Sequence, residues 1–80
     1  RLYLSAMNIL KTLELNIENN EGESDYYINR FMEFLKLYPV DLMVGIMKDI
    51  KSSYVKVYKK AIENEKFVEL YFESYNLIRG

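Results

Sequence analysis

The carboxylates around Gly22 come closest in spacing to a known kind of chemical site. Glu21, Glu23 and Asp25 alternate along this segment, as oxygen ligands do in a calcium-binding loop. Such a loop also needs acidic or amide residues at fixed positions before its glycine and a closing glutamate after it, and this spacing is absent. We therefore expect no metal ion at this segment.

Two further pairs of glutamates, Glu14 with Glu18 and Glu69 with Glu73, are spaced to share a helix face. A di-metal centre or an acid–base pair would need histidine or further inward-facing acids beside them. The sequence contains neither histidine nor cysteine, so it lacks the commonest metal ligand and the commonest general base near neutral pH. It also has no glycine-rich phosphate loop, nucleophile elbow or redox motif. We expect no catalytic activity, no metal and no cofactor.

Aromatic side chains are the most prominent feature of the composition, with eight tyrosines, four phenylalanines and no tryptophan. Aromatic rings bury large areas, so most of them are expected in the core of so short a chain. Tyrosine also joins an apolar ring to a polar tip, which suits contact surfaces. If the domain senses a small ligand, the side chains expected around the pocket are Phe31, Phe34, Met43, Met47, Tyr54 and Tyr58.

A chain of 80 residues supports one domain, over residues 1–80. The formal net charge of −1 gives no nucleic-acid signature, so we expect no nucleic-acid partner through this domain. No apolar run approaches the about 20 residues of a membrane span, and no signal-peptide pattern opens the chain, so we expect no membrane contact and a cytoplasmic location. Because the chain begins at Arg1 rather than methionine, we expect a fragment of a larger protein.

Helix is the structure that the sequence favours throughout. The chain holds one proline and three glycines, and sustained apolar–polar alternation, the pattern of a half-buried sheet, is absent. We expect an all-α fold, a small four-helix bundle with helices over roughly 2–18, 25–38, 40–63 and 65–78.

The first two helices are separated by a polar loop over residues 19–24. Ser24 is expected to cap the second helix, and Asp25 suits its first turn. That helix should end at Tyr38, because a residue before proline is pushed out of the α region, and Pro39 then fits the first position of the next helix. Apolar stripes mark the buried faces of the two helices: Leu2, Ala6, Ile9, Leu10, Leu13 and Ile17, then Ile28, Phe31, Met32, Leu35 and Tyr38.

The third predicted helix, over about 40–63, has the cleanest periodicity. Gly45 and the pair Ser52-Ser53 are the expected places for a bend. Lysines at positions 48, 51, 56, 59 and 60 spread over the opposite, solvated face. The buried stripe is Met43, Ile46, Met47, Ile50, Tyr54, Val57, Tyr58 and Ala61.

After Ala61 the apolar pattern changes phase, which predicts a short connection and a fourth helix capped by Asn64. The expected stripe of this helix is Phe67, Leu70, Tyr71, Leu77 and Ile78. An alternative keeps heptad spacing from Ile50 to Ile78 with Asn64 inside the seam, so that the third and fourth helices form one long helix. The broken form is favoured because Phe67, Leu70 and Leu77 would otherwise face water.

The fourth predicted helix carries apolar side chains around nearly its whole circumference. Such a helix must be covered on more than one side, and three short helices cover one side only. We therefore expect a protein partner, or a second copy of the chain, to cover the rest. The residues expected at this interface are Val68, Phe72, Tyr75 and Tyr71.

Two fragments resemble the ligand-binding and dimerisation domain of TetR-type repressors. They are residues 34–39, where a helix closes on Tyr38-Pro39, and residues 58–67, which are similar to the family's Ala-Ile-x-x-Gly-Glu-Phe run but carry Asn64 at the glycine. The match covers about half the chain, and the DNA-reading helix-turn-helix is absent. The resemblance implies an all-helical regulator domain whose last helices pair with a second subunit around an aromatic pocket for a small ligand.

Taken together, these features favour a non-catalytic helical protein-interaction or oligomerisation module. The alternative is a small-ligand-sensing and dimerisation domain of a transcriptional regulator. An interior cavity above about 300 Å³, the lower end of the size range of ligand sites, would favour the alternative.

Overall fold

The computed structural model describes residues 2–79, apart from the side chains of residues 2–4 and 21. These residues form helices joined by short turns and contain no strand, so the all-α prediction is confirmed. In order they are α1 (Leu2–Asn19), the 3₁₀ turn η1 (Glu21–Glu23), α2 (Ser24–Leu35), α3 (Val40–Ser53), α4 (Val55–Ala61) and α5 (Glu65–Arg79). The described chain therefore has five α-helices, where the sequence predicted four.

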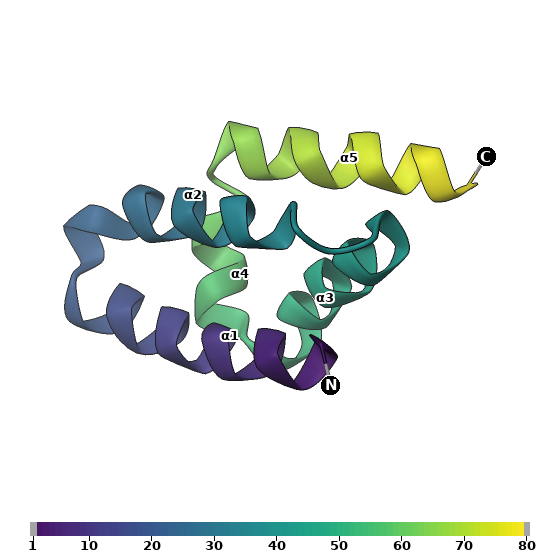
Figure 1. The fold of residues 1–80 in the computed structure, drawn as a ribbon. Helices are drawn as coiled ribbons and strands as arrows, with labels where there is room; N and C mark the ends of the chain where they lie inside the picture. Colours follow the sequence, from purple (N-terminus) through teal and green to yellow (C-terminus); the bar gives the residue numbers. More distant parts are fainter. Residues whose placement is uncertain (1, 80) are drawn as a thin grey trace.

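The helices pack around a core that lies between α1, α2 and the α3–α4 pair (Figure 1). α1 and α2 form a hairpin closed by η1, and α4 crosses both of them. α5 runs beside α2 and packs against α3. The predicted stripes of the first three helices supply this core, although Leu2 lies outside the described side chains. Its main members are Ala6, Leu10, Leu13, Ile17, Ile28, Phe31, Met32, Leu35, Met43, Ile46, Met47, Ile50, Tyr54, Val57 and Ala61.

The third predicted helix is wrong as one continuous element, because the chain breaks at Tyr54 into α3 and α4. Tyr54 has non-helical dihedrals, φ −132° and ψ 65°. The break follows directly on Ser52-Ser53, one of the expected bends, where the Ser52 hydroxyl donates to the carbonyl of Asp49 at 3.3 Å. A serine that bonds back to the preceding turn competes with the helical ladder.

The break at Tyr54 turns α4 back over the hairpin. The tyrosine ring is buried, and its hydroxyl lies 3.5 Å from the Met7 carbonyl on α1. Val57 and Ala61 are fully buried against α1 and α2 as a result. A straight helix over 40–63 would extend for about 36 Å and carry these two residues away from the hairpin.

The boundary before α3 also differs from the prediction. α2 ends at Leu35 rather than at Tyr38, because the chain tightens into turns in which the N–H groups of Leu37 and Tyr38 donate to carbonyls three residues back. Pro39 occupies the N-cap position of α3, with ψ 147°, rather than its first helical position.

The start of α2 lies one residue earlier than predicted. Ser24 is the first residue of α2, and Glu23 holds the N-cap position without a side-chain cap bond. The reason is that η1 runs directly into the helix, so the first turn is already in place when the chain reaches Ser24. Asp25 lies in the first turn as expected.

The turn between α4 and α5 is built on Asn64, whose side chain is buried. Its Oδ1 accepts from the N–H of Phe67 at 3.1 Å, so Asn64 caps α5 as predicted. Its Nδ2 donates to Asp25 Oδ1 at 3.1 Å and to Asn29 Oδ1 at 3.2 Å, both on α2. The alternative of one long helix through Asn64 is wrong, because capping and these bonds to α2 require a break there.

The buried stripe predicted for the fourth helix is only partly correct. Phe67 is buried, but Leu77 is 72% exposed and Ile78 is 41% exposed. The last turn of α5 extends beyond the helices that it packs on (Figure 1), so neither residue has a neighbour to cover it. Ser74, which is polar, takes the buried position on this part of the helix.

Replacing Asn64 should lower the free energy of unfolding by more than the small size of its side chain suggests. Asn64→Ala removes the cap of α5 and leaves polar groups of Asp25, Asn29 and Phe67 without this partner, so we expect a loss of about 2 kcal/mol. Asn76→Ala, the same change at an exposed site on α5, should stay within about 0.5 kcal/mol. Urea unfolding followed by circular dichroism measures both. Equal losses in the two variants would show that Asn64 does not hold α5 in place.

Candidate functional site

α5 stands between two surface grooves. On one side, α5 and α2 form a groove of about 540 Å³, the polar groove, which is lined by Tyr26, Asn29, Arg30, Met32, Glu33, Lys36, Lys66, Glu69, Leu70 and Glu73. On the other side, α5, α3 and α4 form a groove of about 590 Å³, the apolar groove, which is lined by Met47, Lys48, Lys51, Tyr58, Ile62, Phe67, Val68, Tyr71 and Phe72.

The apolar groove has a buried floor and exposed walls. Met47 and Phe67 are buried at its base, whereas Ile62 is 50% exposed and Phe72 is 57% exposed at its edges. The ring of Tyr71 meets the Phe72 ring edge-on, with centroids 5.6 Å apart. The edges of the groove therefore leave apolar side chains in contact with water.

Two lysines of α3 line the apolar groove on the side opposite α5. Lys48 Nζ lies 5.2 Å from the centroid of the Tyr75 ring, a cation–π distance. Tyr75 in turn stacks on Tyr71, with centroids 5.9 Å apart and planes 17° from parallel. Lys51 lies nearby on the same helix and is also exposed. The groove therefore combines an apolar interior with a positive edge.

The structure gathers the four residues predicted at an interface. Val68, Tyr71 and Phe72 line the apolar groove, and Tyr75 joins them through its stacking on Tyr71. Sequence reasoning missed Ile62 and placed the lysines on a solvated face without linking them to this surface. The available signal was Ile62 itself, an apolar residue outside the buried stripe of the third predicted helix.

The six residues predicted around a ligand pocket lie in different places. Phe31 and Phe34 line a hollow of about 500 Å³ between α1 and α2. Met47 and Tyr58 line the apolar groove. Met43 and Tyr54 are buried in the core.

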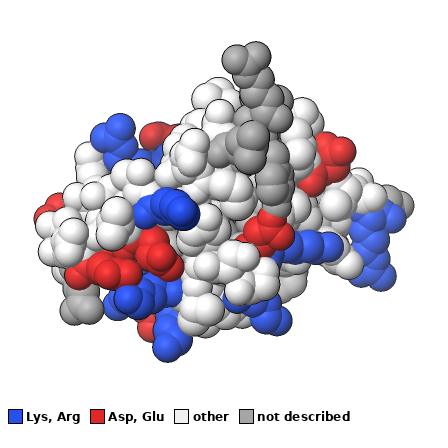
Figure 2. All heavy atoms as spheres, turned by 90° about the horizontal axis from the view of Figure 1, so that it is seen from below, with Lys and Arg blue, Asp and Glu red and all other residues white. Residues whose placement is uncertain are grey.

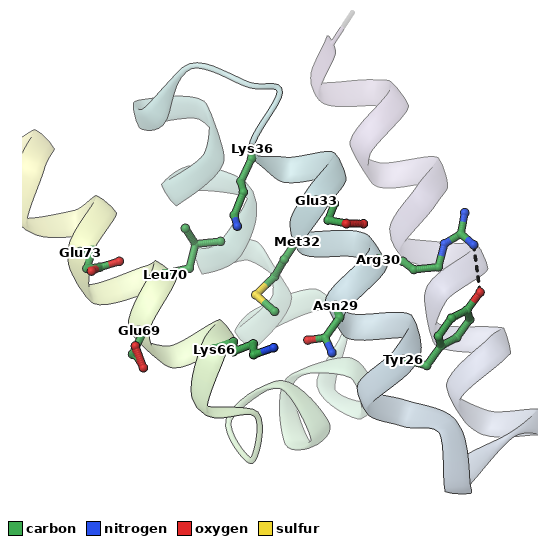
Figure 3. Close-up of a pocket in the computed structure, with 10 residues that line it drawn as sticks. All are labelled: Tyr26, Asn29, Arg30, Met32, Glu33, Lys36, Lys66, Glu69, Leu70 and Glu73. Atoms are coloured by element: carbon green, nitrogen blue, oxygen red, sulfur yellow. Dashed lines mark hydrogen bonds between the residues drawn. The ribbon is translucent and has the colours of Figure 1, made fainter.

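The polar groove carries charges of both signs (Figure 3). Met32 and Leu70 lie between the two helices, and Lys66 extends towards Asn29. Arg30 turns away from α5 and donates to the Tyr26 hydroxyl at 3.0 Å. This bond raises the pKa of Arg30 above its ordinary value. The mixture of signs gives the groove no preference for one kind of charged ligand.

Charges are also mixed on the face of the molecule seen from below, where basic and acidic side chains alternate (Figure 2). A nucleic-acid surface would instead gather lysine and arginine into one patch. Among the described residues, no group of three or more acidic side chains could hold a metal ion. Within the same part of the chain, every helix is too short or too polar to span a bilayer.

Comparisons with protein-family models, curated proteins and solved structures found no match.

One ion pair joins α4 to α1, and its effect on titration can be tested. Lys56 Nζ lies 2.8 Å from Glu18 Oε1, and this hydrogen bond and charge raise the pKa of Lys56 above 10.5. A raised lysine pKa stabilises the fold below the ordinary pKa, and the contribution is lost as pH rises through the raised value. Because both side chains are exposed, the contribution to stability is small.

We expect Glu18→Gln to lower the pKa of Lys56 towards its ordinary value and to leave thermal stability at pH 7 nearly unchanged. NMR titration of the Lys56 ε-methylene between pH 9 and 12 measures the shift. Glu69→Gln, which removes a carboxylate from the polar groove on α5, is the control and should leave this titration as it is. An identical Lys56 curve in wild type and Glu18→Gln would mean that the pair does not form in solution.

Proposed function

We propose that this chain is a non-catalytic helical oligomerisation module that associates with protein chains, copies of itself included, through α5 and the apolar groove. The observation that carries the proposal is the apolar surface formed by exposed Ile62 and Phe72 with half-buried Val68, bordered by Lys48 and Lys51. Apolar patches with a polar border mark interaction sites on small proteins, because leaving them in water is costly.

The residue types in the groove support this proposal. Tyrosine, phenylalanine and methionine are enriched at the centres of protein interfaces, and five of the nine residues that line this groove are of these types. The core of an 80-residue chain is small, so its stability is marginal. Covering the exposed walls of the groove with a partner would add apolar burial that the chain cannot supply alone.

A second candidate function is that of a ligand-sensing and dimerisation domain of a transcriptional regulator, as the resemblance to TetR-type repressors suggests. The observation in its favour is the volume of the apolar groove, about 590 Å³, which lies within the range of ligand sites. Ligand sites usually enclose most of the ligand. This groove lies open, with Phe72 and Ile62 at its edges, so we rank this candidate second.

The proposal predicts self-association that depends on Phe72. We expect the weight-average mass of the wild type in sedimentation equilibrium to rise towards that of a dimer with concentration. Phe72→Lys places a charge in the apolar surface and should keep the chain monomeric. Leu15→Lys is the matched control, since Leu15 is 59% exposed on α1, away from the groove.

Circular dichroism must show the same helix content in all three proteins. Monomers of wild type at every concentration, or equal association of the wild type and Phe72→Lys, would contradict the proposed function. A monomeric wild type in which a small apolar molecule shifts the NMR signals of Met47 and Tyr58 would favour the ligand-sensing candidate.

A further inference from the structure

We infer that the apolar groove of each chain receives α5 of a second copy, and that the two copies do this reciprocally. This inference rests on the proposed function and names the partner. In the dimer, Phe72 of each chain enters the groove of the other. The open side of each groove is then covered only when α5 of the second copy lies in it.

α5 has the spacing of a helix that docks in a groove. Val68, Phe72 and Tyr75 stand at positions i, i+4 and i+7, which place them on one side of the helix. Helices that bind hydrophobic grooves use anchors at this spacing. Phe72 is the central anchor and the most exposed of the three.

Charge complementarity selects a second copy as the occupant. Glu65 and Glu69 follow Phe72 around α5 within about 60°, so the exposed side of this helix is apolar with an acidic border. The groove has the opposite border, Lys48 and Lys51. Within residues 2–79, none of these four side chains forms an ion pair, and the one interaction of Lys48 is its contact with the Tyr75 ring.

The acidic and basic borders also determine whether the two α5 helices of the dimer run parallel or antiparallel. The lysines lie on the α3 side of α5, whereas Glu69 lies on the α2 side, where it lines the polar groove. A twofold axis that runs parallel to α5, between the two copies, keeps the two α5 helices parallel and turns the acidic side of each copy towards the lysine side of the other. An antiparallel pair would place lysine against lysine, which is unfavourable.

The test is an exchange of charges between the two borders. The groove variant carries Lys48→Glu and Lys51→Glu, and the helix variant carries Glu65→Lys and Glu69→Lys. Each variant alone makes like charges face each other on both sides of the twofold axis. We expect the dissociation constant to rise by about tenfold or more in each case.

Mixing the two variants in equal amounts restores opposite charges at both contacts. We therefore expect a heterodimer with a dissociation constant close to that of the wild type, measured by sedimentation equilibrium with one variant fluorescently labelled. The matched control is Lys11→Glu with Lys36→Glu, which changes the net charge as the groove variant does but lies away from the apolar groove. It should associate like the wild type.

The outcomes separate this inference from the proposed function. If Phe72→Lys abolishes association but the charge variants associate like the wild type, or their mixture does not recover, reciprocal docking is overturned and the proposed function stands. If the wild type stays monomeric, or associates regardless of Phe72→Lys, the proposed function is overturned and the inference falls with it. Circular dichroism and thermal unfolding of each variant establish that it is folded.

Discussion

The buried side chain of Asn64 is the constraint on which the placement of α5 depends. Its carbonyl oxygen caps the first turn of α5, and its amide nitrogen donates to two residues of α2. A buried amide must find such partners, because leaving its donors or acceptor unpaired costs more than the bonds themselves contribute. The position at which α5 starts and the helix beside which it runs are therefore set together by one side chain.

The break at Tyr54 also determines where α5 lies. Because α4 turns back over the α1–α2 hairpin, the chain reaches Asn64 close to α2, and α5 can return along α3. Met47 of α3 and Phe67 of α5 then meet at the base of a groove that neither helix forms alone. The exposed apolar surface follows from the path of the chain between two helix breaks.

The sequence predicted the parts of this structure that depend on local pattern. The buried stripes of the first three predicted helices, the cap at Asn64 and the presence of a helix boundary before Pro39, though not its position, follow from spacing and residue chemistry over a few turns. Tyr54 was missed as a break because its ring fits the buried stripe and only its backbone departs from the helix. Leu77 was placed in the core because periodicity does not reveal where the neighbouring helices end.

In the candidate site too, local pattern predicts the residues of one helix, whereas it does not predict the residues that another helix contributes. The apolar excess of α5 lies within one helical segment, so the sequence alone predicts Val68, Phe72 and their neighbours as candidate residues. Lys48 and Lys51 belong to another helix, and only the packing of α3 on α5 brings them to the same surface. In the dimer that we propose, their role differs from that of the apolar residues, because apolar area stabilises any contact whereas charge at its border distinguishes one orientation from another. A site of this kind needs both apolar area and charge at its border, and the position of the charges follows only from the packing of α3 on α5.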